Sequence, residues 1–141
     1  MPDLPPEHQE PQPGFEILQE NYRAIMDTLQ DSYFEADKTG FVTYANWGFI
    51  KNTGYDSRED VIGRHFRHFT HRSGIKDVYK NFKKVFESGQ PVPPFEYRYR
   101  RKDGTLMIGD AYISPIIPEN EVVGTRGLLR DITAKLNAEQ A

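Results

Sequence analysis

The hydrophobic pattern first predicts a helix over residues 15–30. Its apolar residues step by three and four along the chain, as in a heptad seam, and polar residues fall elsewhere on the helix. The seam consists of Phe15, Leu18, Tyr22, Ile25 and Leu29. It either packs on its own domain or joins a second copy of the chain, and a homodimer joined along it is the assembly we expect.

The next segment predicts a hairpin over residues 32–45. Aromatic and β-branched residues fill both arms, and Asp37–Gly40 supplies the turn, where Gly40 can adopt a positive φ. If Glu35 and Asp37 face water, Phe34 and Ala36 face the core.

Three helical segments follow the hairpin. Asn46 is expected to cap a short helix that ends before Gly54, and Ser57 begins a second one, which ends at Gly63. Apolar residues at helical spacing then predict a longer helix over residues 73–88, closed by Gly89.

Three strands complete the pattern. Residues 95–100 alternate between aromatic and charged side chains, which predicts the first of them. A turn at 103–104 leads to the second strand, 105–115, and a turn at 118–120 leads to the third, 122–132. Two strands, several helices and three more strands form the element order of an α+β fold.

Composition narrows the class of protein. The 141 residues suffice for one domain, and residues 1–14, with five prolines, are expected to form a disordered leader. The formal charge of −3 gives no general drive towards nucleic acid or anionic lipid. The sequence has no cysteine, no signal-peptide pattern and no apolar run long enough to span a membrane, which suits a cytoplasmic protein.

Five short motifs, taken in order, resemble a PAS sensory domain with its C-terminal PAC half. They are Asp37–Gly40, Asn46 with Phe49 and Gly54-Tyr55, Glu59–Gly63, Arg101–Thr105, and Gly124 with Gly127 and Asp131-Ile132-Thr133. The resemblance covers about residues 20–135. It implies a PAS/PAC sensor over residues 31–133, with a five-stranded antiparallel sheet in the order 2-1-5-4-3 and helices over one face.

The resemblance also implies a role in signal transduction, as in two-component systems. Asp131, Ile132 and Thr133 match the motif at which the last strand of a PAS domain passes into a linker helix, here residues 134–141. That helix would lead to an effector such as a histidine kinase, a cyclic-di-nucleotide enzyme or a transcription regulator.

Small residues in the strand 105–115 indicate a candidate ligand pocket. Gly109 and Ala111 share one face of this strand, and a glycine inside a strand often marks the close approach of another group. Either a small amphipathic ligand or a neighbouring aromatic ring fills the space beside them. The expected lining is Tyr44, Phe49, Tyr79, Phe82, Tyr97, Tyr99, Met107, Gly109 and Ala111.

The sequence leaves the ligand itself undetermined. Covalent flavin photochemistry and a cysteine-tethered coumaroyl group both need a cysteine, which this sequence lacks. Haem-binding PAS domains resemble one another in placing the axial histidine on the long helix. Haem is disfavoured because residues 73–88, the matching helix here, contain no histidine. A non-covalent flavin or another small organic ligand remains open. His65, His68 and His71 lie close in sequence, but no acidic residue is near them, so no metal site is predicted.

No catalytic residues are predicted either. Phosphate-binding glycine loops and the G-x-S-x-G motif of hydrolases are absent. Two alternatives to a sensor remain: a ligand-free PAS module used only for association, and a small enzyme of the cone-shaped α+β type. The enzyme is disfavoured because Asp110 alternates onto the face opposite Gly109 and Ala111.

Overall fold

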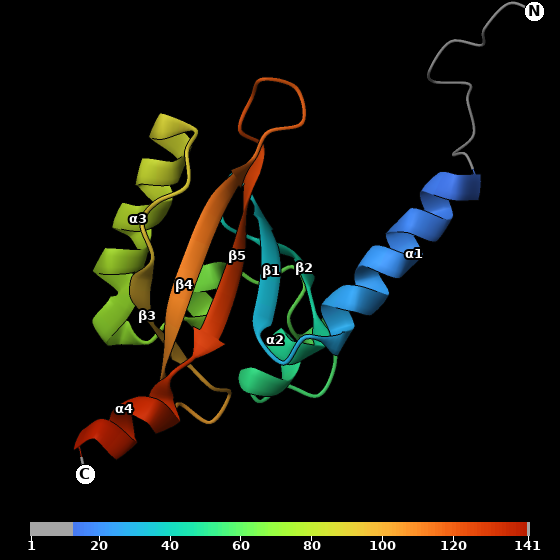
Figure 1. The fold of residues 1–141 in the computed structure, drawn as a ribbon. Coiled ribbons are helices and arrows are strands. Elements are labelled where there is room, and N and C mark those ends of the chain that lie inside the picture. Colours follow the sequence, from blue (N-terminus) through green and yellow to red (C-terminus); the bar gives the residue numbers. More distant parts are fainter. Residues whose placement is uncertain (1–12, 141) are drawn as a thin grey trace, which may run out of the picture.

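One antiparallel sheet organises the computed structural model, which describes residues 13–140. Its strand order is β2-β1-β5-β4-β3 (Figure 1), so the order implied by the family resemblance is confirmed. The strands are β1 (Ser32–Asp37), β2 (Val42–Ala45), β3 (Phe95–Arg100), β4 (Leu106–Ile116) and β5 (Gly124–Asp131).

Helices cover one face of this sheet. They are α2 (Trp47–Asn52), α3 (Ile75–Ser88) and three 3₁₀ turns, η2 (Arg58–Asp60), η3 (Phe66–Phe69) and η4 (Arg72–Gly74). Two further helices flank the domain: α1 (Pro13–Thr28) projects away from it beside β1 and β2, and α4 (Thr133–Gln140) continues from the end of β5 (Figure 1).

The core lies between the sheet and the covering helices. Phe34 and Ala36 of β1 are buried in it, as the alternation along this strand predicts. From the sheet it also includes Ala111, Ile113 and Leu129, and from the helices Phe49, Ile50, Val78, Phe82 and Val85.

Several predicted helix boundaries are confirmed. Asn46 caps α2 by accepting a hydrogen bond from the backbone N–H of Phe49, and Gly89 ends α3 in the left-handed conformation at φ 63°. Of the predicted leader, residues 1–12 lie outside the described residues. Pro13 and Gly14 belong to α1, whose first turn tolerates a proline because an N–H at that position would have no helical partner.

The helix predicted after Ser57 is wrong in type. Only one 3₁₀ turn forms, and the Ser57 hydroxyl donates to the Asp60 carboxylate at 3.2 Å instead of capping a backbone N–H. A longer helix is prevented because Gly63 and Arg64 form backbone hydrogen bonds with Val42 in β2. Similarly, α3 begins at Ile75 and not at residue 73, because residues 72–74 form the separate turn η4.

No helix within residues 13–140 combines the length and the apolar character needed to cross a membrane.

Candidate functional site

A small cavity lies between the sheet and the covering helices. Its volume is about 10 Å³, close to the smallest space that holds one water molecule. The lining consists of Phe34, Val42, Phe49, Thr53, Phe66, Phe69, Tyr97, Tyr99 and Leu129. In this structure the core is therefore almost completely filled by its own side chains.

Gly109 shows how that space is filled. A Cβ atom placed on Gly109 would lie 3.5 Å from Cε1 of Tyr99 and 3.2 Å from the carbonyl oxygen of Arg130. The ring of Tyr99 thus lies at contact distance from the position of the missing Cβ. Of the two occupants expected from the sequence, the structure has the aromatic ring beside Gly109.

Most of the other predicted pocket residues also lie in the core. Phe49, Tyr97 and Tyr99 line the cavity, Ala111 is completely buried, and Met107 packs against the same cluster. Phe82 is buried on α3 beside Phe66, with 4.5 Å between the two ring centroids.

Tyr44 and Tyr79 do not line the cavity, and the prediction that placed them there is corrected. The ring centroid of Tyr44 lies 6.1 Å from that of Tyr33, on the outer side of the sheet towards α1. A register shift between Glu35 and Ala36 turns Tyr44 away from Val42, which stays in the core. Tyr79 is 42% exposed on the outer surface of α3.

Two buried tyrosines connect the cavity to its surroundings. The Tyr97 hydroxyl is hydrogen-bonded to the hydroxyl of Thr70, and burial raises the pKa of Tyr97 above its ordinary value. Burial also raises the pKa of Tyr99, and the negative charge of the neighbouring Asp131 raises it further. Tyr99 therefore links the core to the first residue of the predicted output motif.

That motif fixes the start of α4 to the sheet. The carboxylate of Asp131 accepts two hydrogen bonds from Thr133, one from its backbone N–H at 2.9 Å and one from its hydroxyl at 2.6 Å. The same hydroxyl accepts a hydrogen bond of 2.8 Å from the backbone N–H of Ile108 in β4. The backbone N–H of Ile132 donates to the Ile108 carbonyl, also at 2.8 Å.

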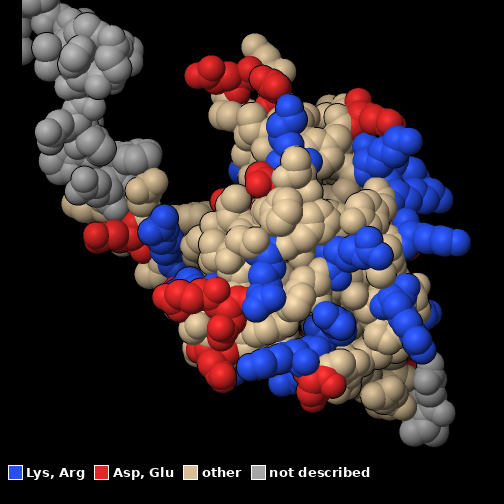
Figure 2. All heavy atoms as spheres, turned by 180° about the vertical axis from the view of Figure 1, so that it is seen from behind, with Lys and Arg blue, Asp and Glu red and all other residues tan. Residues whose placement is uncertain are grey.

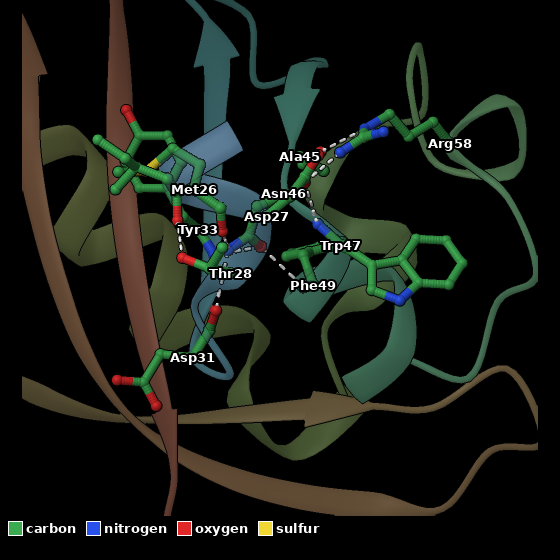
Figure 3. A network of polar contacts seen from close by, with 11 residues as sticks. Met26, Asp27, Thr28, Asp31, Tyr33, Ala45, Asn46, Trp47, Phe49 and Arg58 are labelled. Carbon is green, nitrogen blue, oxygen red and sulfur yellow. Dashed lines mark hydrogen bonds and ion pairs between the residues drawn. The ribbon is translucent and has the colours of Figure 1, made fainter. Parts of the chain in front are cut away.

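Asn46 forms a comparable junction at the other flanking helix (Figure 3). Its side-chain oxygen accepts hydrogen bonds from the backbone N–H groups of Tyr33, at 2.9 Å, and Phe49, at 2.8 Å. Its amide nitrogen donates to the carbonyl oxygens of Met26, at 2.8 Å, and Asp31, at 3.0 Å. This fully buried side chain therefore joins the end of α1 to β1 and α2.

An ion pair reinforces this junction. Asp27, near the end of α1, pairs with Arg58 and accepts a hydrogen bond of 2.8 Å from the backbone N–H of Trp47 (Figure 3). Arg58 also donates to the carbonyl oxygen of Ala45 at 3.1 Å. Sequence reasoning identified Asn46 as a helix cap and as part of a family motif, and no local pattern indicated Asp27 or Arg58.

Only part of the predicted heptad seam on α1 packs against the chain's own domain, and the rest is exposed. Tyr22 packs on its own domain, and its hydroxyl lies 2.8 Å from that of Tyr33 and 3.1 Å from the carboxylate of Glu35. Leu18 and Ile25 are 68% and 57% exposed, Ile17 and Leu29 are exposed as well, and the side chain of Phe15 lies outside the described part of the chain.

Comparison with known proteins identifies the family. A family model described as a PAS domain matches residues 30–134. The chain belongs to the PAS domain family. The sequence resemblance is thereby confirmed, and the domain is classed with sensory modules of signal transduction.

One relative is a kinase. This PAS domain is 25% identical over 127 residues to sporulation kinase C of Bacillus subtilis, a match that covers 89% of this chain and 29% of the kinase. The chain thus spans less than a third of that relative.

Solved PAS domains share the fold. The PAS domain of a Colwellia psychrerythraea protein is 28% identical, with a TM-score of 0.74 and coverage of 84% of this chain and 98% of that one. The PAS domain of an HTR-like protein from Haloarcula marismortui is 25% identical, with a TM-score of 0.69 and coverage of 83% and 93%.

The three neighbouring histidines of this PAS domain have structural partners. His65 and His71 each accept a backbone N–H through Nδ1 and so cap the turns η3 and η4. Nε2 of His68 lies 2.7 Å from the hydroxyl of Tyr55. Among the residues that the structure describes, no group of three or more His, Asp or Glu side chains is placed to hold a metal ion.

Proposed function

We propose that this PAS domain is the signal-input module of a longer signalling protein, and that α1 and α4 pass its conformational state to an effector. One observation carries the proposal. Thr133, the first residue of α4, is hydrogen-bonded both to Asp131 and to β4, and Asp131 lies beside the core residue Tyr99. A shift of the Tyr99 ring would therefore act directly on the start of α4.

A histidine kinase is the effector we favour, on the basis of the similarity to sporulation kinase C. A cyclic-di-nucleotide enzyme attached through the same helix is the alternative. The exposed apolar residues of α1 support a homodimer joined along this helix, and the cysteine-free composition suits a cytoplasmic location.

The core cavity is the place where a small ligand would act as the input. Pockets for small molecules usually measure about 300–1,000 Å³, so the cavity of about 10 Å³ would have to open by movement of its aromatic rings. A small amphipathic ligand or a non-covalent flavin would enter in this way. The closed core favours a second candidate function, in which the domain binds no ligand and senses or associates through protein contacts alone.

The coupling itself is testable without knowledge of the signal. Residues 13–141 are fused through α4 to a reporter histidine kinase in a series of fusion proteins that lengthen the linker one residue at a time. Because each residue rotates a helix by about 100°, kinase activity should rise and fall with the helical period. Constant activity across the series would show that α4 is only a tether.

Native mass spectrometry separates the two candidate inputs. A mass excess over the polypeptide, or visible absorbance of the purified protein, identifies a bound ligand. The bare mass of the chain, with no stabilisation by flavin or other small molecules, supports the ligand-free module.

A further inference from the structure

Charge is strongly segregated along this chain and over its surface. Residues 64–102 contain 11 Lys and Arg and three Asp and Glu, whereas the remaining residues contain seven and 18. Figure 2 shows Lys and Arg side chains across one face of the molecule, most densely on the side where α3 lies. The net charge of −3 therefore conceals a strongly basic face.

An open groove lies on this basic face, where η3, η4, α3 and the edge strand β3 meet. Its volume is about 620 Å³, far larger than that of the core cavity. Arg67, Arg72 and Arg100 line it from three different elements, and no acidic residue is among its lining side chains. Lys76 and Lys80 extend the positive charge along the exposed surface of α3.

The arginines of the groove are available for a ligand. Within the described part of the chain, no Asp or Glu forms an ion pair with Arg67, Arg72 or Arg100. Nε of Arg100 donates to the carbonyl oxygen of His68 at 2.9 Å, which positions this side chain and leaves its terminal nitrogens free to bind an anion. Planar guanidinium groups are well suited to phosphate oxygens.

An aromatic surface adjoins these cations. The ring of Tyr79 lines the groove and is 42% exposed, and it stacks at 26° against His65, with 6.2 Å between the ring centroids. Ile75 adds an apolar contact beside it. Burial lowers the pKa of His68, which also lines the groove, and the positive charges of Arg64 and Arg100 lower it further.

We propose that this groove binds single-stranded nucleic acid, with the phosphates on Arg67, Arg72 and Arg100 and a base stacked on Tyr79. A basic groove interleaved with an exposed aromatic ring is the arrangement by which proteins hold single strands with little sequence preference. An acidic polypeptide or an anionic membrane would use the charge but has no need for the ring. The proposal is separate from the sensing function, because neither the core nor α4 takes part.

Fluorescence anisotropy tests the proposal on the whole chain. The probe is a fluorescein-labelled oligouridine or oligothymidine of about 12 nucleotides. We expect saturable binding whose affinity falls with salt, with a log–log slope of about −2, because each neutralised phosphate of a single strand contributes about −0.7. A duplex of the same length should bind more weakly than the single strand.

Three variants localise the site. Arg67→Gln with Arg72→Gln should weaken binding about tenfold or more and reduce the salt slope by about 1.4. Tyr79→Ala should weaken it about fivefold or more with no change in slope, because it removes stacking and no charge. Lys83→Gln with Lys84→Gln removes two charges from the same face outside the groove, so it should change the affinity less than about threefold.

Several outcomes would overturn the proposal. Absence of binding at low salt would do so, as would equal losses in the arginine and lysine variants, which would mean that the face attracts polyanions without a site. Binding that is insensitive to Tyr79→Ala, or that polyglutamate or phosphatidylserine vesicles displace as readily as unlabelled oligonucleotide, would identify an acidic partner or a membrane instead.

Discussion

Thr133 Oγ1 lies 2.6 Å from Asp131 Oδ1 and donates a hydrogen bond to it, so the first residue of α4 is held by the last residue of β5. The same Asp131 lies beside Tyr99, one of the residues that line the core cavity. The core of this PAS domain is therefore connected to the helix that would carry its output through the ring of Tyr99, the carboxylate of Asp131 and the two hydrogen bonds from Thr133 to that carboxylate.

Asp131→Ala should loosen the start of α4 and leave the sensor folded. Loss of the hydrogen bonds to Thr133 is expected to cost about 0.5–2 kcal/mol locally. Amide hydrogen exchange should accelerate in α4 while protection in β1 and β5 stays at the parent level. Asp131→Asn is the control, since it keeps an acceptor oxygen. Unchanged exchange in α4 would mean that Asp131 does not hold this helix.

Substitutions on the exposed side of α1 test the dimer. Leu18→Glu with Ile25→Glu places two charges on side chains that the domain itself leaves 68% and 57% exposed. Light scattering should report monomers, and circular dichroism should report an intact sheet. Ala24→Glu with Gln30→Glu adds the same charge at exposed positions away from the seam and should preserve the dimer. If the first variant keeps the mass of the parent, the exposed stripe is not the dimer interface.

Asn46→Ala should destabilise the domain strongly. It leaves two backbone N–H groups and two carbonyl oxygens without the partner they have in the folded state. The free energy of unfolding, measured with urea, should fall by at least about 2 kcal/mol. Asn52→Ala, which removes hydrogen bonds to Gln30 and Ser32 at a less buried position, should cost less. An equal or smaller loss for Asn46→Ala would show that its network contributes little.

His68 should make stability depend on pH. Burial, followed by the charges of Arg64 and Arg100, lowers its pKa in the folded state below the ordinary 6.5. The unfolded chain then binds the proton first, so stability from this group is present above pH 6.5 and is lost as the pH falls through the folded-state pKa. Urea midpoints at pH 7.5 and 5.5 should therefore differ more for the parent than for His68→Gln. Equal differences would exclude His68 as the source.

The helices and strands could be predicted because their signals are local, whereas the strand order was implied by the family resemblance. Alternation in β1 and β3, helical spacing in α3 and the capping residues Asn46 and Gly89 each specify structure within a few residues. The extent of the segment after Ser57 could not be predicted in this way. Its length depends on backbone pairing between Gly63 and Val42, which lie far apart in sequence.

The candidate site was harder to predict because it too depends on contacts between residues that lie far apart in sequence. Alternation places Val42 and Tyr44 on one face of a regular strand, but the register shift beside Ala36 separates them. The small size of Gly109 indicated a close neighbour, yet only the folded chain shows that the carbonyl oxygen of Arg130 and the ring of Tyr99 lie beside it. Charge segregation is visible in the sequence, whereas the groove that gathers three arginines requires the packing of η3 and η4 against β3.

The most direct test of the account is Gly109→Ala in residues 13–141 fused to the reporter kinase. The added methyl group would crowd the carbonyl oxygen of Arg130, next to Asp131, and would touch the ring of Tyr99, without reaching α4 itself. Coupling free energies of about 1–3 kcal/mol predict a change in autophosphorylation of about fivefold or more, and Asp131→Ala should abolish most of that change. Kinase activity at the parent level in a folded Gly109→Ala fusion would contradict the claim that the core controls α4.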